Sequence, residues 1–282
     1  MPGERDLDAM LRGLSPDLDD TEYVYAVVPA GSPIPPVEAV VRVEEPEGTT
    51  LVVRADDASA RGIRQEFACR RITLRIHSDL EAVGLTAAIS RALATEGLPA
   101  NVVAGFHHDH VFVPADRADL ARAVLVDLTA SPTIRPASSS DEEDLWHLLR
   151  YASWADEGEE IRQAPYLQPY VEDWGRASDV GVLAVGPSGR IVGAAWARPL
   201  TDAVPELAVA TVPSQRGSGL GTRLIESLVA EMSERSLPVL RLDVRTANPA
   251  IRLYERLGFE RVGTTTNRVG GTSIVMERSI AP

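Results

Sequence analysis

Apolar and polar positions alternate along the first half of the chain in short runs that are separated by turn residues. The runs at 23–28, 39–43, 49–54 and 71–77 are typical of β-strands, and those at 102–106 and 111–113 predict a hairpin. Helical spacing predicts helices over 6–13, 78–96 and 116–128, the second of them opened by Ser78 and Glu81 as a capping box. This order predicts an α+β layer with helices on one face of an antiparallel sheet.

The second half begins with a strand-like segment at Thr133 and predicts a hairpin from 180–185 and 191–197. An alternating run at 206–211 then ends in a glycine-rich turn, after which apolar side chains fall on one helical face: Leu220, Leu224, Ile225, Leu228 and Met232. A run at 239–244 follows, and then a short helix that we expect to open at Asn248-Pro249 and to end at Gly258. Ser131-Pro132 marks the predicted junction, giving domains 1–131 and 132–282.

Composition and charge narrow the classes of function. The chain has 282 residues and a net charge of −13, from 28 basic and 41 acidic side chains, which argues against a nucleic-acid partner. Cys69 is the only cysteine and lies in an apolar-alternating run, so we expect a buried, inert thiol and no thiolate metal site. The start, MPGERDLDAM, lacks the apolar core of a signal peptide, and no apolar run approaches ~20 residues. These features predict a cytoplasmic protein without a membrane partner.

The turn RGSGLGT (216–222) is the first candidate for chemistry. A strand that leads through glycines into a helix directs backbone N–H groups and the positive end of the helix at one place, which suits a phosphate. The pattern is neither the dinucleotide fingerprint nor a P-loop, because no Gly-Lys-Ser/Thr follows. A purely structural strand–helix turn is the alternative.

Two segments in order, VPSQRGSGLG (212–221) and NPAIRLYERLGF (248–259), resemble the acyl-CoA-binding core of the GNAT family of N-acetyltransferases. The resemblance extends from Ile134 onward; one departure is that Tyr254 comes six positions after Asn248, one fewer than in many members. It implies a GNAT fold with a mixed central sheet and acetyl-CoA as co-substrate. The residues implied to bind it are Val209, Ala210, Thr211, Arg216, Gly217, Ser218, Gly219, Leu220, Gly221, Thr222 and Asn248.

Acetyl transfer to an amine needs no covalent enzyme intermediate, but it needs a proton acceptor for the ammonium and a proton donor for the thiolate. The family pattern makes Tyr254 the candidate acid, and a buried aromatic on an amphipathic helix is the alternative. The resemblance favours Glu206 as the base, because some family members carry a catalytic glutamate at the start of the central strand. Asp243, at an acidic position of the ribosomal-protein acetyltransferases, is the competing base, and alternation places it on one face with Arg241 and Arg245, so an ion pair is its alternative. Either carboxylate could act through water.

The sequence defines the binding site of the amine acceptor less clearly than that of the cofactor. The aromatic-rich stretch 155–176, with Trp154, Tyr166, Tyr170 and Trp174, either selects the acceptor or packs a long loop in place. The acceptor could be a protein lysine, a protein N-terminus or a small amine.

In the first half, ITLRIHSDLEAVGLTAAI and NVVAGFHHDHVFVP resemble a bacterial ACT-domain family related to arginine-sensing ACT proteins. The resemblance implies a ferredoxin-like, βαβ-type domain that binds an amino acid, although the acidic ligand-binding residue of the arginine sensors aligns near Ala82. Asp109 would accept the ligand's ammonium and the helix end at Ser78 its carboxylate; a hairpin turn and a helix cap are the alternatives. Adjacent residues of the HHDH segment point to opposite faces, so we expect no metal site.

Together these features predict an ACT-like regulatory domain followed by a GNAT N-acetyltransferase that uses acetyl-CoA, is controlled by an amino acid, and leaves room for a homo-oligomer through the first domain. The alternative class is a non-catalytic sensor that binds an amino acid and acyl-CoA and signals through a partner protein.

Overall fold

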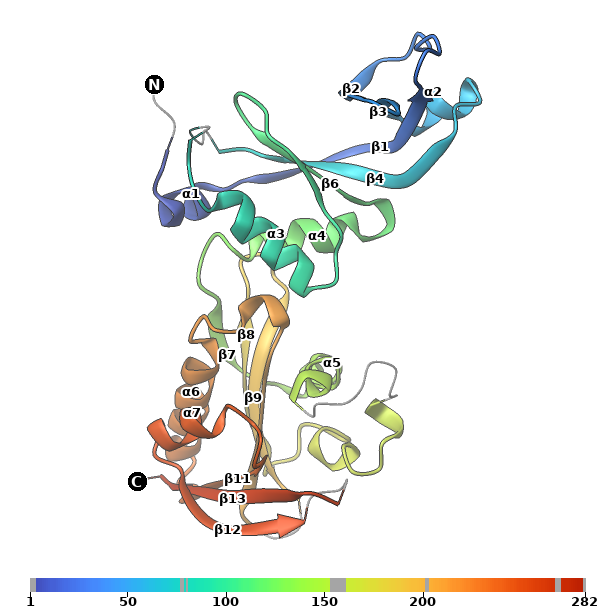
Figure 1. Cartoon of the computed structure of the whole chain (residues 1–282). Helices are drawn as coiled ribbons and strands as arrows, with labels where there is room; N and C mark the ends of the chain where they lie inside the picture. Colours follow the sequence, from blue (N-terminus) through green and yellow to red (C-terminus); the bar gives the residue numbers. More distant parts are fainter. Residues whose placement is uncertain are drawn as a thin grey trace. The chain divides into compact units, whose positions relative to one another are not determined.

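The computed structural model describes residues 4–76, 79, 81–152, 161–200, 203–266 and 270–280. The chain divides into two compact units, Met1–Ser131 and Pro132–Pro282, which are described separately below and can be followed by colour in Figure 1. Within the described ranges no helix is both long and apolar enough to cross a membrane.

The N-terminal unit is built on an antiparallel sheet that has six strands in the described residues, in the order β2-β3-β1-β4-β6-β5. The strands are β1 (Pro16–Pro29), β2 (Ala39–Glu45), β3 (Gly48–Arg54), β4 (Gln65–Leu74), β5 (Asn101–Val103) and β6 (Asp109–Pro114). The helices are α1 (Leu7–Gly13), α2 (Ala55–Ala60), α3 (Leu85–Thr95), the 3₁₀ turn η1 (Ala115–Arg117) and α4 (Ala118–Val126). Helices α3 and α4 lie together on one face of the sheet (Figure 1), where they share an apolar core with β4 and β6.

The predicted α+β layer is confirmed, but the predicted start of the second helix is wrong. Helix α3 begins at Leu85 behind Gly84, whose φ is +107°, and not at Ser78, which lies outside the described residues. Glu81, the expected partner in the capping box, instead pairs with Arg5 at 2.8 Å, and Arg5 also holds Asp79 at 2.9 Å. Asp79 and Glu81 thus contact a residue more than seventy positions away, which sequence spacing alone does not reveal.

The C-terminal unit contains a mixed sheet with seven described strands in the order β12-β13-β11-β10-β9-β8-β7. They are β7 (Thr133–Pro136), β8 (Val180–Val185), β9 (Ile191–Pro199), β10 (Pro205–Thr211), β11 (Val239–Arg245), β12 (Glu260–Thr266) and β13 (Thr272–Ser279). Only β10 and β11 run parallel among these described pairs. The helices are α5 (Glu142–Ala152), α6 (Leu220–Glu234) and α7 (Ile251–Arg256), with 3₁₀ turns η2 (Ser139–Asp141), η3 (Ile161–Gln163), η4 (Gln168–Tyr170) and η5 (Pro213–Gln215). Figure 1 shows α6 and α7 on one side of β9 and α5 on the other.

The sequence pattern gives the packing of α6 correctly but misplaces the start of α7. The predicted apolar face of α6 is buried in full: Leu220, Leu224, Ile225, Leu228 and Met232. Helix α7 begins at Ile251 and not at Asn248-Pro249. The Asn248 side chain still accepts a backbone hydrogen bond, from Ala250 at 2.9 Å, so it stabilises a turn that precedes the helix. Gly258, at φ +80°, follows the last turn as predicted.

Candidate functional site

The central strands of the C-terminal unit separate along their length. Strand β10 pairs with β9 at every position from Pro205 to Thr211, whereas its parallel register with β11 is limited to Glu206 opposite Arg241. Beyond Glu206 the two parallel strands therefore diverge, and the segment 209–211 of β10 has a ladder on its β9 side only. Such a segment offers backbone groups to a ligand that runs alongside the strand.

The turn that follows β10 is open and rich in backbone donors. Gly217 and Gly219 have φ of +79° and +82°, a conformation that favours glycine, and no heavy atom lies within 4 Å of where a Cβ would be at either position. The Ser218 hydroxyl donates to the Gln215 carbonyl oxygen at 2.7 Å and closes the turn. Gly219 caps α6, a helix whose first-turn N–H groups have no acceptor within the helix. The turn thus combines N–H donors with a positive helix end in open space, as an anion site requires.

Helix α7 contacts this turn. A Cβ on Gly221, in the first turn of α6, would lie 3.8 Å from Cδ2 of Leu253, the residue before Tyr254. Tyr254 is 9% exposed and packs edge-on against Phe259, with ring centroids 5.9 Å apart. Burial raises the pKa of Tyr254 to about 12, so its hydroxyl carries its proton throughout the neutral range. The two sequence motifs therefore meet in space, with a proton donor on the second.

The two candidate bases have different surroundings. Glu206 is half-buried on β10 and accepts a hydrogen bond from the Tyr170 hydroxyl. Asp243 is exposed on β11, and its strand buries alternate residues, so Arg241 and Asp243 do share a face as predicted. Arg241 bonds to Glu277 on β13, at 2.9 Å from Nε and 2.8 Å from Nη2.

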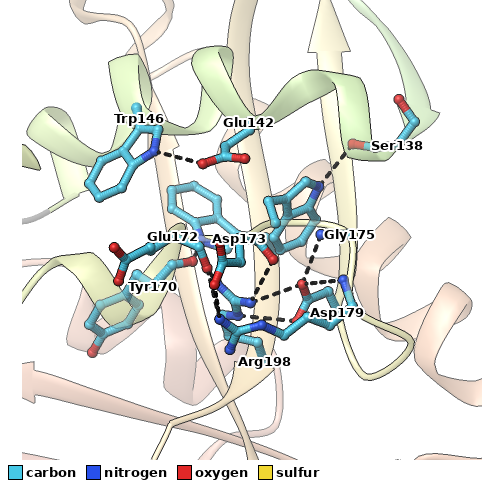
Figure 2. Close-up of polar contacts among 12 residues, drawn as sticks. Ser138, Glu142, Trp146, Tyr170, Glu172, Asp173, Gly175, Asp179 and Arg198 are labelled. Carbon is cyan, nitrogen blue, oxygen red and sulfur yellow. Dashed lines mark hydrogen bonds and ion pairs between the residues drawn. The ribbon is translucent and has the colours of Figure 1, made fainter.

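A buried charge cluster lies beside Glu206, and the sequence pattern does not predict it. Figure 2 shows the Arg198 guanidinium against Asp179, with both contacts at 3.1 Å and both side chains 1% exposed. Arg198 also donates to the carbonyl oxygens of Glu172 at 2.9 Å and Asp173 at 3.4 Å. Burial lowers the pKa of Arg198 and the charge of Asp179 opposes that shift. The sequence feature that indicates this cluster is a single arginine, Arg198, in the otherwise apolar run IVGAAWARP.

These contacts fix the described part of the aromatic-rich stretch. The indole Nε1 of Trp196 donates to the Tyr170 carbonyl oxygen, and that of Trp174 to the Ser138 carbonyl oxygen, both at 2.9 Å. Gly175 has φ +109°, and a Cβ there would lie 2.7 Å from that of Ser139, so glycine is required. Packing therefore accounts for Trp174 and for the backbone at Tyr170, whereas Trp154 lies outside the described residues.

In the N-terminal unit, Asp109 is half-buried at the start of β6, opposite Leu74 of β4. Burial raises its pKa, and His110 and His108 act in the opposite direction. The neighbouring histidines have local partners: His108 Nδ1 lies 3.3 Å from the Ile76 carbonyl oxygen and His110 Nδ1 lies 3.1 Å from the Thr73 hydroxyl. Among the described residues, no cluster of three metal-ligating side chains is present. Cys69 is fully buried and burial raises its thiol pKa to about 12, as expected for an inert thiol.

Known families match both units. Residues 2–70 and 66–127 match ACT domains, and residues 146–259 match the acetyltransferase (GNAT) family. The matches identify a GNAT acetyltransferase domain in the C-terminal unit and ACT domains in the N-terminal unit, as the two resemblances predicted.

Two of the similar proteins are named acetyltransferases, and a third is a solved structure without an assigned function. A mycothiol acetyltransferase from Thermomonospora curvata is 31% identical over 137 residues, which cover 46% of this chain and 44% of that protein. The chain thus spans less than half of this relative's length. A mycothiol acetyltransferase from Salinispora arenicola is 28% identical over 261 residues, covering 81% of this chain and 84% of the relative. A solved structure from Vibrio cholerae, titled a protein of unknown function and possible transport protein, is 40% identical over 44% of this chain and 96% of its own, with a TM-score of 0.41.

Proposed function

We propose that the protein is an acetyl-CoA-dependent N-acetyltransferase whose acceptor is an amine. The observation that carries the proposal is the open glycine turn at the start of α6, which follows a strand that has separated from its parallel neighbour and is contacted by α7. In this proposal the segment 209–211 lies beside the pantetheine. Arg216 and the turn 217–222 bind the pyrophosphate, and Asn248, which already caps a local turn, approaches the cofactor.

The proposed reaction is direct. The amine nitrogen attacks the thioester carbonyl carbon, the C–S bond breaks, and the CoA thiolate leaves. Glu206 accepts the proton that the ammonium loses, directly or through water, and Tyr254 donates a proton to the thiolate. The nitrogen loses a second proton as the amide forms, and this proton restores the Tyr254 hydroxyl, directly or through water. Burial keeps the Tyr254 hydroxyl protonated at neutral pH, so a proton is held at this position. Asp243 is the competing base.

The acceptor and the effector are also proposals. Because two relatives bear the name mycothiol acetyltransferase, the amine panel should include the unacetylated form of mycothiol beside small amines, lysine peptides and peptide N-termini. For the N-terminal unit we propose an amino-acid effector, with its ammonium on Asp109 at the start of β6. Release of CoA that depends on one of these amines would establish the enzyme. Tight acetyl-CoA binding without release from any of them would favour the sensor.

The first prediction concerns the cofactor turn. Gly219→Asp places a negative charge against the phosphates at the residue that precedes α6, and its positive φ of +82° makes the substitution strained, as it does in the control below. Calorimetry should show acetyl-CoA affinity reduced by about tenfold or more, equivalent to roughly 1.4 kcal/mol or more. The matched control is Gly189→Asp, with φ +84° and equally open space in the β8–β9 turn. Equal binding by the two variants would exclude the turn from the site.

The second prediction concerns the proton donor. Tyr254→Phe preserves the packing against Phe259 and removes the hydroxyl, so kcat should fall ~10²–10⁴-fold while acetyl-CoA affinity is kept. Tyr25→Phe, in the N-terminal unit, removes a half-buried hydroxyl elsewhere and should leave kcat unchanged. A Tyr254→Phe enzyme with the rate of the unmodified protein would assign this tyrosine a packing role alone.

The third prediction separates the two carboxylates. A general base must be ionised, so kcat/KM should rise with pH through its titration, and its amide variant should lose that rise. We expect Glu206→Gln to abolish the ascending limb and Asp243→Asn to retain it. The reverse result would transfer the role to Asp243, and retention by both would mean that the amine arrives already neutral.

The fourth prediction concerns regulation. If an amino acid binds two states of the protein unequally, at least one proteinogenic amino acid should raise Tm and change the acetylation rate roughly 5–150-fold. Asp109→Ala should abolish both effects, whereas Asp116→Ala, an exposed carboxylate of the same unit, should preserve them. If none of the amino acids changes either quantity, amino-acid control is wrong and a role in oligomerisation becomes the better account of the unit.

A further inference from the structure

The side-chain hydroxyl and the backbone carbonyl oxygen of Tyr170 each make a hydrogen bond. Its hydroxyl donates to Oε1 of Glu206, and its carbonyl oxygen accepts the Trp196 indole N–H at 2.9 Å. In Figure 2 its ring extends away from the Arg198 cluster, so the backbone is fixed by β9 while the side chain reaches β10. A tyrosine that packed only as an apolar wall would not need both contacts.

The strand register explains why the two contacts coincide. Trp196 and Arg198 of β9 lie directly opposite Ala208 and Glu206 of β10, and cross-strand partners project from the same face of a sheet. Trp196 holds the loop at Tyr170, and Arg198 holds it just beyond, at the carbonyl oxygens that follow. The hydroxyl is therefore aligned with Glu206 by the strand pair that carries the carboxylate.

The charged groups around Glu206 are fixed by their own partners. Arg198, opposite on β9, is bound by Asp179, and Arg241, opposite on β11, is bound by Glu277 of β13. Further along the same face of β11 come Asp243 and Arg245, while α5 presents buried leucines: Leu145, Leu148 and Leu149. A Tyr170→Phe substitution leaves all of these charges in place, so it tests what the hydroxyl contributes to the titration of Glu206.

We propose that Tyr170 is a positioning residue for the base: it orients the Glu206 carboxylate and stabilises its ionised form in a half-buried site. A hydrogen bond donated to a carboxylate favours the charged form and counteracts the effect of burial. The inference rests on the proposed function, because it assigns a role within acetyl transfer to an amine. It adds a residue from the loop between α5 and β8 to the catalytic arrangement of β10 and α7.

The first measurement requires no turnover. In the full-length protein labelled with ¹³C at glutamate side chains, and with Glu206 assigned by the Glu206→Gln variant, the Glu206 carboxyl resonance is followed across pH. Tyr170→Phe should move its titration midpoint upward by about one pH unit, since a hydrogen bond to a charged group is lost. Tyr151→Phe, which removes a hydroxyl from α5 of the same unit, should leave the midpoint unchanged, and an unchanged Tm in both variants confirms folding.

The second measurement uses activity. The ascending limb of kcat/KM should move upward by the same amount in Tyr170→Phe, with reduced kcat and unchanged acetyl-CoA affinity. An unmoved carboxyl midpoint overturns the inference, and so does a moved midpoint with an unmoved limb, because Glu206 would not be the base that Tyr170 serves. Failure of the unmodified protein to release CoA with any amine counts against the proposed function, while the carboxyl titration still decides whether Tyr170 stabilises ionised Glu206.

Discussion

The buried ion pair between Arg198 and Asp179 is the interaction on which one wall of the C-terminal site depends. Removing two charges from water is costly, and their attraction offsets that cost only when the remaining donors and acceptors are satisfied. Here the guanidinium also donates to two carbonyl oxygens, and Asp179 accepts backbone N–H groups of Gly175 and Arg176 at 3.0 Å. Removing either Arg198 or Asp179 would leave the other charge buried and unpaired, which typically lowers the free energy of unfolding by about 3–5 kcal/mol. The pair and its hydrogen bonds therefore join the loop at 172–179 to strand β9 through contacts that are all satisfied within the described residues.

This wall and the glycine turn belong to opposite faces of one sheet. The loop that carries Tyr170 packs with α5, whereas the turn leads into α6 and contacts α7. A sheet with continuous hydrogen bonding would separate a carboxylate on the face covered by α5 from a tyrosine on the face covered by α6 and α7. The divergence of β10 from β11 beyond Glu206 removes that barrier, since no continuous ladder closes the sheet there. The parallel pair is thus the place where groups from both faces can approach one thioester.

Sequence predicted most of this architecture where local spacing determines structure. The apolar face of α6 follows from its helical period, and the order of the two motifs gave the GNAT fold. Contacts between distant residues could not be predicted in this way: Arg5 bonds to Asp79 from seventy-four positions away, Asp179 meets Arg198 from nineteen, and Tyr170 meets Glu206 from thirty-six. Such contacts depend on which strands become neighbours, and a single chain's periodicity does not encode that. The roles of Tyr254, Glu206 and Asp243 stay predictions.

The environments of Glu206 and Tyr254 differ in the direction that acid–base chemistry requires. Tyr254 is shielded from water by the core, and burial alone raises its pKa, which keeps the proton on the oxygen throughout the neutral range. Glu206 is only half-buried and receives a hydroxyl hydrogen bond, which favours the form without the proton. Two titratable groups whose surroundings separate their protonation states in this way can divide acid and base roles at one pH. The burial of Tyr254, the proposed proton donor, and the hydrogen bond to Glu206, the proposed proton acceptor, both result from packing around the diverging strands β10 and β11.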